Sequence, residues 1–143
     1  MEKLNEKTKQ IMNERFGKDS IIALATVENG VPYVRNVNAY YENGAFYIIT
    51  YGISYKMKQI EKNPVVAVAG EWFTAHGEGV NMGYFGKTEN SEIAEKLKNV
   101  FAEWIDNGHN DFSDVNTCIL QIRLTDGVIL SHGTRIEVDF TAE

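Results

Sequence analysis

Two Asn-Gly dipeptides, Asn29-Gly30 and Asn43-Gly44, constrain the fold of this chain more than any other feature. Each stands between runs rich in β-branched and aromatic residues, and Asn and Gly tolerate the positive φ angles that a two-residue hairpin turn needs. The runs at 20–27, 31–41 and 45–51 are therefore expected to form consecutive antiparallel strands. This meander argues against a doubly wound parallel sheet, in which helices connect successive strands.

Further β-rich runs follow, and strands are expected at 64–69, 71–84, 117–124, 128–132 and 134–140. The run 64–69 is apolar on both faces, which predicts a central strand, and Asp126-Gly127 is expected to be a turn between two closing strands. Apolar spacing predicts three helices, at 3–16, 54–62 and 90–105. Because a sheet of six to eight twisted strands tends to close and remove its edges, the expected fold class is α+β, mainly β, with an antiparallel barrel.

Composition limits the classes of partner. The 143 residues are expected to form one domain, 1–143, because no linker or repeat divides them. Twenty acidic against fourteen basic residues give a net charge of −6, which argues against nucleic-acid binding. No apolar run reaches the roughly 20 residues that span a bilayer, the start lacks the apolar segment of a signal peptide, and the single cysteine excludes an internal disulfide. We expect a cytoplasmic protein that binds neither membrane nor nucleic acid.

An anion held by such an acidic chain needs a local basic cluster, and Arg35, Ser54 and Lys56 form the candidate. Ser54 is the expected N-cap of the helix at 54–62, where free backbone N–H groups and the helix dipole favour a phosphate. Lys56 adds a positive charge in the same first turn, and Arg35 could donate a bidentate contact from the second strand. Each feature alone is commonplace, so the specificity of the prediction rests on their combination. The chain has no Walker loop, dinucleotide fingerprint or zinc-binding spacing, so no metal site is expected.

Five segments, at the expected distances and in order, resemble the pyridoxamine 5′-phosphate oxidase-like, FMN-binding split-barrel family. They are Leu24-Ala-Thr-Val27, Tyr33-Val-Arg-Asn-Val37, Phe46-Tyr-Ile-Ile-Thr-Tyr51, Ser54-Tyr-Lys56 and Asn63-Pro-Val-Val-Ala-Val68. The resemblance implies a six-stranded antiparallel split β-barrel with flanking helices, FMN as cofactor, and a homodimer with a flavin at each of two interfacial sites. The segments 70–77 and 104–109 look most like small bacterial members related to general stress proteins or nitroimidazole reductases.

The resemblance also implies roles for particular residues. The FMN phosphate is expected to bind to Arg35, Ser54, Tyr55 and Lys56. The ring edge is expected to lie along the backbone groups of Asn36 and Val37. The ring and the ribityl chain are expected to contact Ile49 and Thr50. Trp72 could stack near the ring, although a large aromatic side chain at such a place also suits the core or a dimer contact.

The implied activity is that of an FMN-dependent oxidoreductase, an NAD(P)H-linked reductase or an oxidase, acting on a small molecule. The family's oxidase carries a Lys shortly after the strand Arg, whereas this chain has Asn38-Ala-Tyr40 there, which argues against oxidation of vitamin B6. Two alternatives stay open: a non-catalytic flavin carrier or stress-related sensor, and a barrel that binds a deazaflavin or haem. His76 and His132 are candidates for a place beside the flavin, whereas His109 is expected in an exposed loop.

Overall fold

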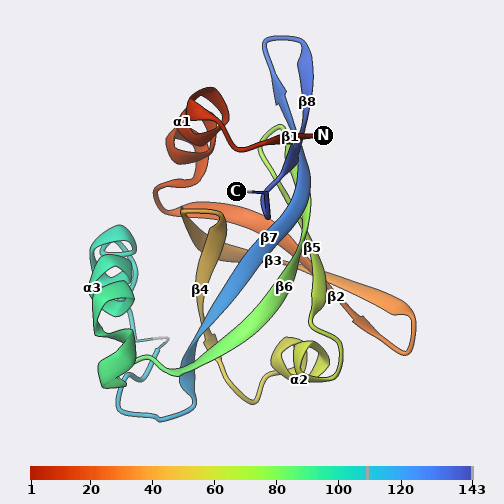
Figure 1. The fold of residues 1–143 in the computed structure, drawn as a ribbon. Coiled ribbons are helices and arrows are strands. Elements are labelled where there is room, and N and C mark those ends of the chain that lie inside the picture. The colour runs from red at the N-terminus through yellow and green to blue at the C-terminus, as the bar shows by residue number, and fades with distance from the viewer. Residues whose placement is uncertain (109, 143) are drawn as a thin grey trace.

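The computed structural model describes residues 1–108 and 110–142, so His109 lies outside the described residues. Its centre is a closed barrel of six antiparallel strands in the order β7-β4-β3-β2-β5-β6, and β6 pairs back onto β7 (Figure 1). The barrel strands are β2 (Ser20–Glu28), β3 (Val31–Glu42), β4 (Ala45–Tyr51), β5 (Val65–Gly70), β6 (Phe73–Tyr84) and β7 (Thr117–Ser131). The strands β8 (Thr134–Asp139) and β1 (Glu2–Lys3) extend the sheet beyond β7. The split barrel with flanking helices is therefore confirmed.

The β2–β3–β4 meander forms as the Asn-Gly pairs predict. Asn29 and Asn43 have φ angles of 52° and 47°, and the glycine after each has a φ angle near 80° (78° and 83°). β3 pairs with β2 over residues 31–39 but with β4 only over residues 40–42, because β4 then turns away to pair with β7 along its whole length. Within the described residues, the 31–39 part of β3 has no strand on its β4 side. This gap is the split in the barrel.

Three helices flank the barrel. α1 (Glu6–Phe16) starts later than predicted because the Asn5 side chain accepts a hydrogen bond from the Thr8 N–H and caps the helix. α2 (Tyr55–Lys62) follows β4 as expected and buries Met57 and Ile60. No helix in the described ranges 1–108 and 110–142 has both the length and the apolar character needed to cross a bilayer.

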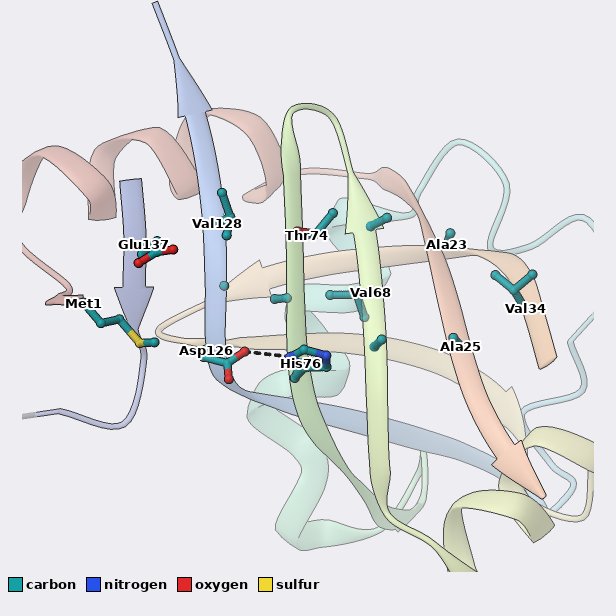
Figure 2. Close-up of a pocket in the computed structure, with 14 residues that line it drawn as sticks. Met1, Ala23, Ala25, Val34, Val68, Thr74, His76, Asp126, Val128 and Glu137 are labelled. Carbon is teal, nitrogen blue, oxygen red and sulfur yellow. Dashed lines mark hydrogen bonds and ion pairs between the residues drawn. The ribbon is translucent and has the colours of Figure 1, made fainter. Parts of the chain in front are cut away.

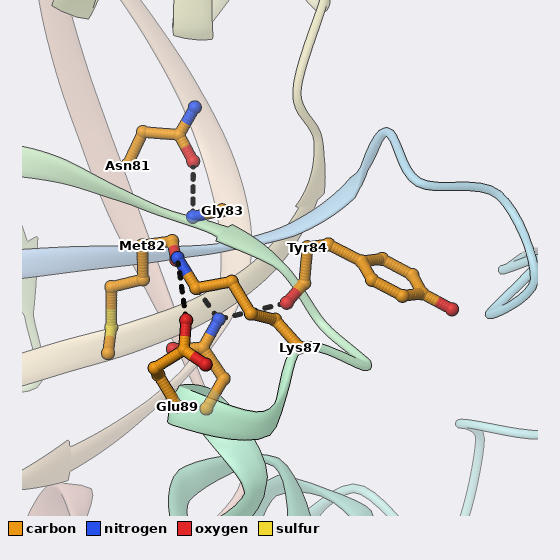
Figure 3. Close-up of polar contacts among 7 residues, drawn as sticks. Asn81, Met82, Gly83, Tyr84, Lys87 and Glu89 are labelled. Atoms are coloured by element: carbon orange, nitrogen blue, oxygen red, sulfur yellow. Dashed lines mark hydrogen bonds and ion pairs between the residues drawn. The ribbon is translucent and has the colours of Figure 1, made fainter.

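The third helix, α3 (Ser91–Val100), covers β4 and β7 with a separate apolar cluster that includes Leu97 and Phe101. It ends earlier than predicted, and the short 3-10 helix η1 (Thr88–Asn90) precedes it. The end of β6 is tied to this helix, because the Asn90 amide donates to the backbone oxygens of Met82 and Tyr84, at 3.0 and 2.9 Å. Figure 3 shows Met82 and Tyr84 close to Lys87 and Glu89, which lie just before the helix.

One predicted turn is wrong. Asp126-Gly127 lies inside the continuous strand β7, because Gly127 pairs with Ala75 on one side and with Val138 on the other. Ladder pairing on both edges outweighs the local preference for a turn. A side chain at Gly127 would meet the Thr74 carbonyl oxygen at 2.9 Å, so close approach of the strands explains this glycine.

The barrel has a packed interior, and its outer face is apolar along β5. β5 lies between β2 and β6, as a central strand should, and its inward residues Val66 and Val68 are buried. Its outward residues are not covered, because Val65 and Ala69 are exposed. The apolar pattern on both faces of β5 therefore reflects a buried face and an exposed apolar face.

Candidate functional site

Two cationic side chains lie near each other where β3 and β4 separate. Arg35 projects from the inner face of β3 opposite Leu24, and Lys56 lies in the first turn of α2; both are half-buried. Burial lowers the pKa of Lys56, and the positive charge of Arg35 lowers that pKa further. In the described part of the chain, neither cation has a carboxylate within 4.0 Å. Two like charges are thus held together without a counter-ion.

Two buried hydroxyl groups beside the same gap have no hydrogen-bond partner among the described residues: Thr50 Oγ1 and Ser54 Oγ. Thr50 is 6% exposed on β4, and Ser54 is the N-cap of α2, although its hydroxyl does not cap the helix. A buried hydroxyl without a partner costs about 1–3 kcal/mol. Cations without counter-ions and hydroxyls without partners fit a ligand that brings both negative charge and polar groups.

Neutral acceptors orient the Arg35 guanidinium. Its Nη1 donates to Thr26 Oγ1 at 2.7 Å and to the Leu24 carbonyl oxygen at 3.3 Å, and its Nη2 is 3.5 Å from Gln59 Oε1. Thr26 and Gln59 are almost fully buried, at 0% and 3% exposure. Neither residue was predicted from the sequence, although Thr26 is a polar residue at an inward position of an apolar strand, which is a signal for such a role.

The structure distributes the other predicted site residues over several surfaces. Asn36 is exposed on the outer face of β3, whereas Val37 packs against the barrel core. Ile49 packs in the apolar cluster under α3, on the opposite face of β4 from Thr50. Tyr55 is exposed at the start of α2. The structure therefore places Lys56 beside Arg35 and puts Thr50 and Ser54 on the segment that leads from β4 into α2, whereas the Ile49 side chain faces α3.

Trp72 lies away from this group. It occupies the β5–β6 turn with a φ angle of 52° and is 65% exposed. β5 starts three residues after α2 ends, so Trp72 is at the far end of a six-residue strand, which spans about 20 Å. His132, in the β7–β8 turn, lines a cavity of about 570 Å³ together with Trp72. Arg15 lies between these two segments and donates to the carbonyl oxygens of Trp72 and Leu130, at 3.1 and 2.7 Å.

A hollow of about 490 Å³ lies on the outer face of the barrel (Figure 2). Its floor is largely alanine, contributed by β2, β5 and β6, and at one side His76 Nδ1 lies 2.8 Å from Asp126 Oδ1. The lining residues of β2 and β3, such as Ala25 and Val34, alternate along their strands with inward residues such as Arg35. The sheet therefore separates His76 from the Arg35–Lys56 pair within one chain.

Comparisons with known proteins agree with this architecture. The sequence model of the family described as pyridoxamine 5′-phosphate oxidase matches residues 8–126. No curated protein matches the chain.

Three solved structures are similar to the chain. A FAD-binding protein from Mesorhizobium loti has a TM-score of 0.66 at 14% identity, over 87% of this chain and 92% of that chain. The General Stress Protein 26 from Bacillus anthracis has a TM-score of 0.65 at 21% identity, over 83% and 90% of the two chains. A NimC/NimA family protein from Clostridium acetobutylicum has a TM-score of 0.63 at 20% identity, over 92% and 94%. At these identities the likeness shows a shared fold.

Proposed function

This chain belongs to the pyridoxamine 5′-phosphate oxidase family, and we propose that it binds FMN at the gap between β3 and β4 and acts as an FMN-dependent oxidoreductase on a small molecule. When bound, the flavin supplies the redox chemistry, and the protein supplies binding, orientation and electrostatics. The observation that carries the proposal is the Arg35–Lys56 pair, which has no carboxylate within 4.0 Å among residues 1–108 and 110–142, together with the buried Thr50 and Ser54 hydroxyls that lack a partner in that part of the chain.

In this proposal, the phosphate of FMN lies between Arg35 and Lys56 at the N-terminus of α2. The Ser54 hydroxyl and the Tyr55 amide would donate to it, because N–H groups in the first turn of a helix have no intrahelical acceptor. Thr50 would bond a hydroxyl of the ribityl chain. The unpaired edge of β3 at Asn36 and Val37 offers backbone donors and acceptors to the ring, and Ile49 would contribute through its backbone.

The same groups favour FMN over haem. A phosphate monoester is a compact dianion, which suits one guanidinium and one ammonium group acting together. Haem needs an axial ligand to its iron, and the Arg, Lys, Ser and Thr side chains of this group are not among the usual His, Cys, Met and Tyr ligands. A phosphorylated deazaflavin would use the same contacts, so mass spectrometry of the copurifying molecule separates it from FMN.

The first test is the visible spectrum of the purified chain with and without added FMN. We expect flavin absorption bands, and quenching of flavin fluorescence on titration. No flavin bands and no quenching would overturn the proposal, and a Soret band would replace it with haem binding. Anaerobic addition of NADH or NADPH then tests catalysis: bleaching of bound FMN supports the oxidoreductase, whereas no reduction by either nucleotide favours a carrier or sensor.

We also propose that a second copy of the chain covers the outer face of the barrel. Val34 is 70% exposed there, and the adjacent alanine-floored hollow is apolar. We expect Val34→Lys to shift the protein from dimer to monomer in analytical ultracentrifugation. Val115→Lys is the matched control, because Val115 is 68% exposed on a loop that does not line the hollow. A monomeric wild-type protein would refute the dimer.

Trp72 lies at the end of β5 that is far from α2, and so far from the proposed phosphate site of its own chain. We therefore propose that Trp72 contacts the flavin whose phosphate is bound by the other copy. Substitution Trp72→Ala should then weaken flavin binding in the dimer. In the Val34→Lys background, where no second copy is present, the same substitution should have no effect. An equal loss of affinity in both backgrounds would place Trp72 at its own chain's flavin instead.

A further inference from the structure

We propose that Thr26 and Gln59 are positioning residues that hold Arg35 through neutral acceptors, so that the site selects flavin with a terminal phosphate over riboflavin. This inference rests on the proposed FMN site and adds the determinant of its specificity. Neither residue belongs to the set that the family resemblance assigns to the cofactor.

The contacts form one connected network. Thr26 Oγ1 accepts from Arg35 Nη1 at 2.7 Å and donates to Gln59 Oε1, while Gln59 Oε1 also lies 3.5 Å from Arg35 Nη2. The Gln59 Nε2 donates to Glu28 Oε2 at 3.1 Å. The Thr26 hydroxyl thus uses its donor and its acceptor at the same time, which fixes its rotation, and both side chains of the network that touch Arg35 are buried.

Gln59 keeps a carboxylate away from Arg35. Its amide presents an oxygen to the guanidinium and a nitrogen to Glu28, a division that only an amide side chain can make at this position. Glu28 is bound to Gln59 and lies more than 4.0 Å from the Arg35 nitrogens, as the described ion pairs show. The positive charge of Arg35 is therefore oriented without being neutralised.

The geometry also leaves donors for a ligand. A guanidinium has five N–H groups, and three contacts, to Leu24, Thr26 and Gln59, use three of them. Two N–H groups remain, which is the number that a bidentate contact with a phosphate needs. Riboflavin has no phosphate and gains nothing from this orientation, so the network should affect the affinity for FMN alone.

The test compares dissociation constants for FMN and riboflavin in variants of the whole chain. Thr26→Val replaces the hydroxyl by a methyl group of similar size, and we expect it to weaken FMN binding roughly tenfold while riboflavin binding stays unchanged. Thr26→Ser restores the hydroxyl and should recover the FMN affinity. Equal losses for both flavins in Thr26→Val, or no rescue by serine, would overturn the inference and leave the FMN site standing.

A second variant tests the role of charge even if Thr26→Val does not fold. Gln59→Glu combined with Glu28→Gln moves the carboxylate beside Arg35 at constant net charge. We expect FMN binding to weaken roughly a hundredfold with riboflavin unaffected, whereas unchanged FMN affinity would overturn the inference. If wild-type protein binds neither flavin, the proposed function itself fails, which is a separate result.

Discussion

Replacing Lys56 by methionine should weaken FMN binding and, at the same time, stabilise the free protein. Methionine keeps most of the length and packing of the lysine stem but removes the ammonium group. In the free protein that group is partly buried and faces the positive charge of Arg35, with no carboxylate of the described chain within 4.0 Å. Opposite effects on binding and stability are the expected signature of charges that are placed for a ligand.

The size of each effect follows from elementary electrostatics. Two unit charges 4 Å apart attract by about 4 kcal/mol at the effective dielectric constant of a protein surface, and a hydrogen bond to a charged group contributes about 1.5–3 kcal/mol net. We therefore expect the loss of one of two phosphate-binding cations to cost about 3 kcal/mol, or roughly a hundredfold in Kd. Relief of the repulsion from Arg35 should add about 1 kcal/mol to the free energy of unfolding, or about 3 °C in Tm.

The assay pairs FMN fluorescence titration with thermal unfolding of the flavin-free protein. Lys58→Met is the matched control, because Lys58 is exposed on the same helix and should change neither quantity. If Lys56→Met leaves FMN affinity unchanged, or lowers the stability of the free protein, the reasoning about uncompensated charge is refuted.

Three further predictions test the same site. Thr50→Val removes an unpartnered buried hydroxyl, so the free protein should gain about 1 kcal/mol of stability while FMN binding weakens several-fold, as measured by urea unfolding and titration; a loss of stability would contradict this. In the folded protein the pKa of Lys56 is lowered below its usual 10.5. Between the folded-state pKa and the usual pKa, the unfolded chain therefore binds more protons than the folded one. The free energy of unfolding of the wild type relative to Lys56→Met should therefore rise with pH through this alkaline window, and FMN affinity should fall as the Lys56 ammonium group loses its proton. Finally, Gly79→Ala places a Cβ 2.7 Å from Ile60 Cγ2, which should displace α2 and reduce both stability, by about 1–3 kcal/mol, and FMN affinity; an unchanged melting temperature would show that α2 tolerates the shift.

The sequence was sufficient where local chemistry decides the structure. Asn-Gly turns need positive φ angles, and apolar spacing identified α2 with its buried Met57 and Ile60. It failed at Asp126-Gly127, where pairing with strands on both sides decides the conformation. No local pattern reports such long-range pairing.

At the candidate site, too, some features could be predicted from the sequence and others could not. The proximity of Arg35 to Lys56 followed from a combination of residue types and the family resemblance. The contributions of Thr26 and Gln59 did not, because their contacts join a strand to a helix about 30 residues later in the chain. Similarly, the placement of Ile49 under α3 depends on which face of β4 that helix covers, and the alternating pattern of the strand cannot specify it.

The divergence of β4 from β3 has a consequence for how the protein is handled in the cell. On its β4 side, the 31–39 part of β3 presents main-chain donors and acceptors that no neighbouring strand in the described structure takes up, whereas its other side pairs with β2. Such an open border invites extended segments of other molecules to add to it, which is the first step of β-aggregation. If FMN binds at this border as proposed, newly made chains that bind it late should be lost to insoluble material, and the yield on expression should depend on the flavin supply of the host.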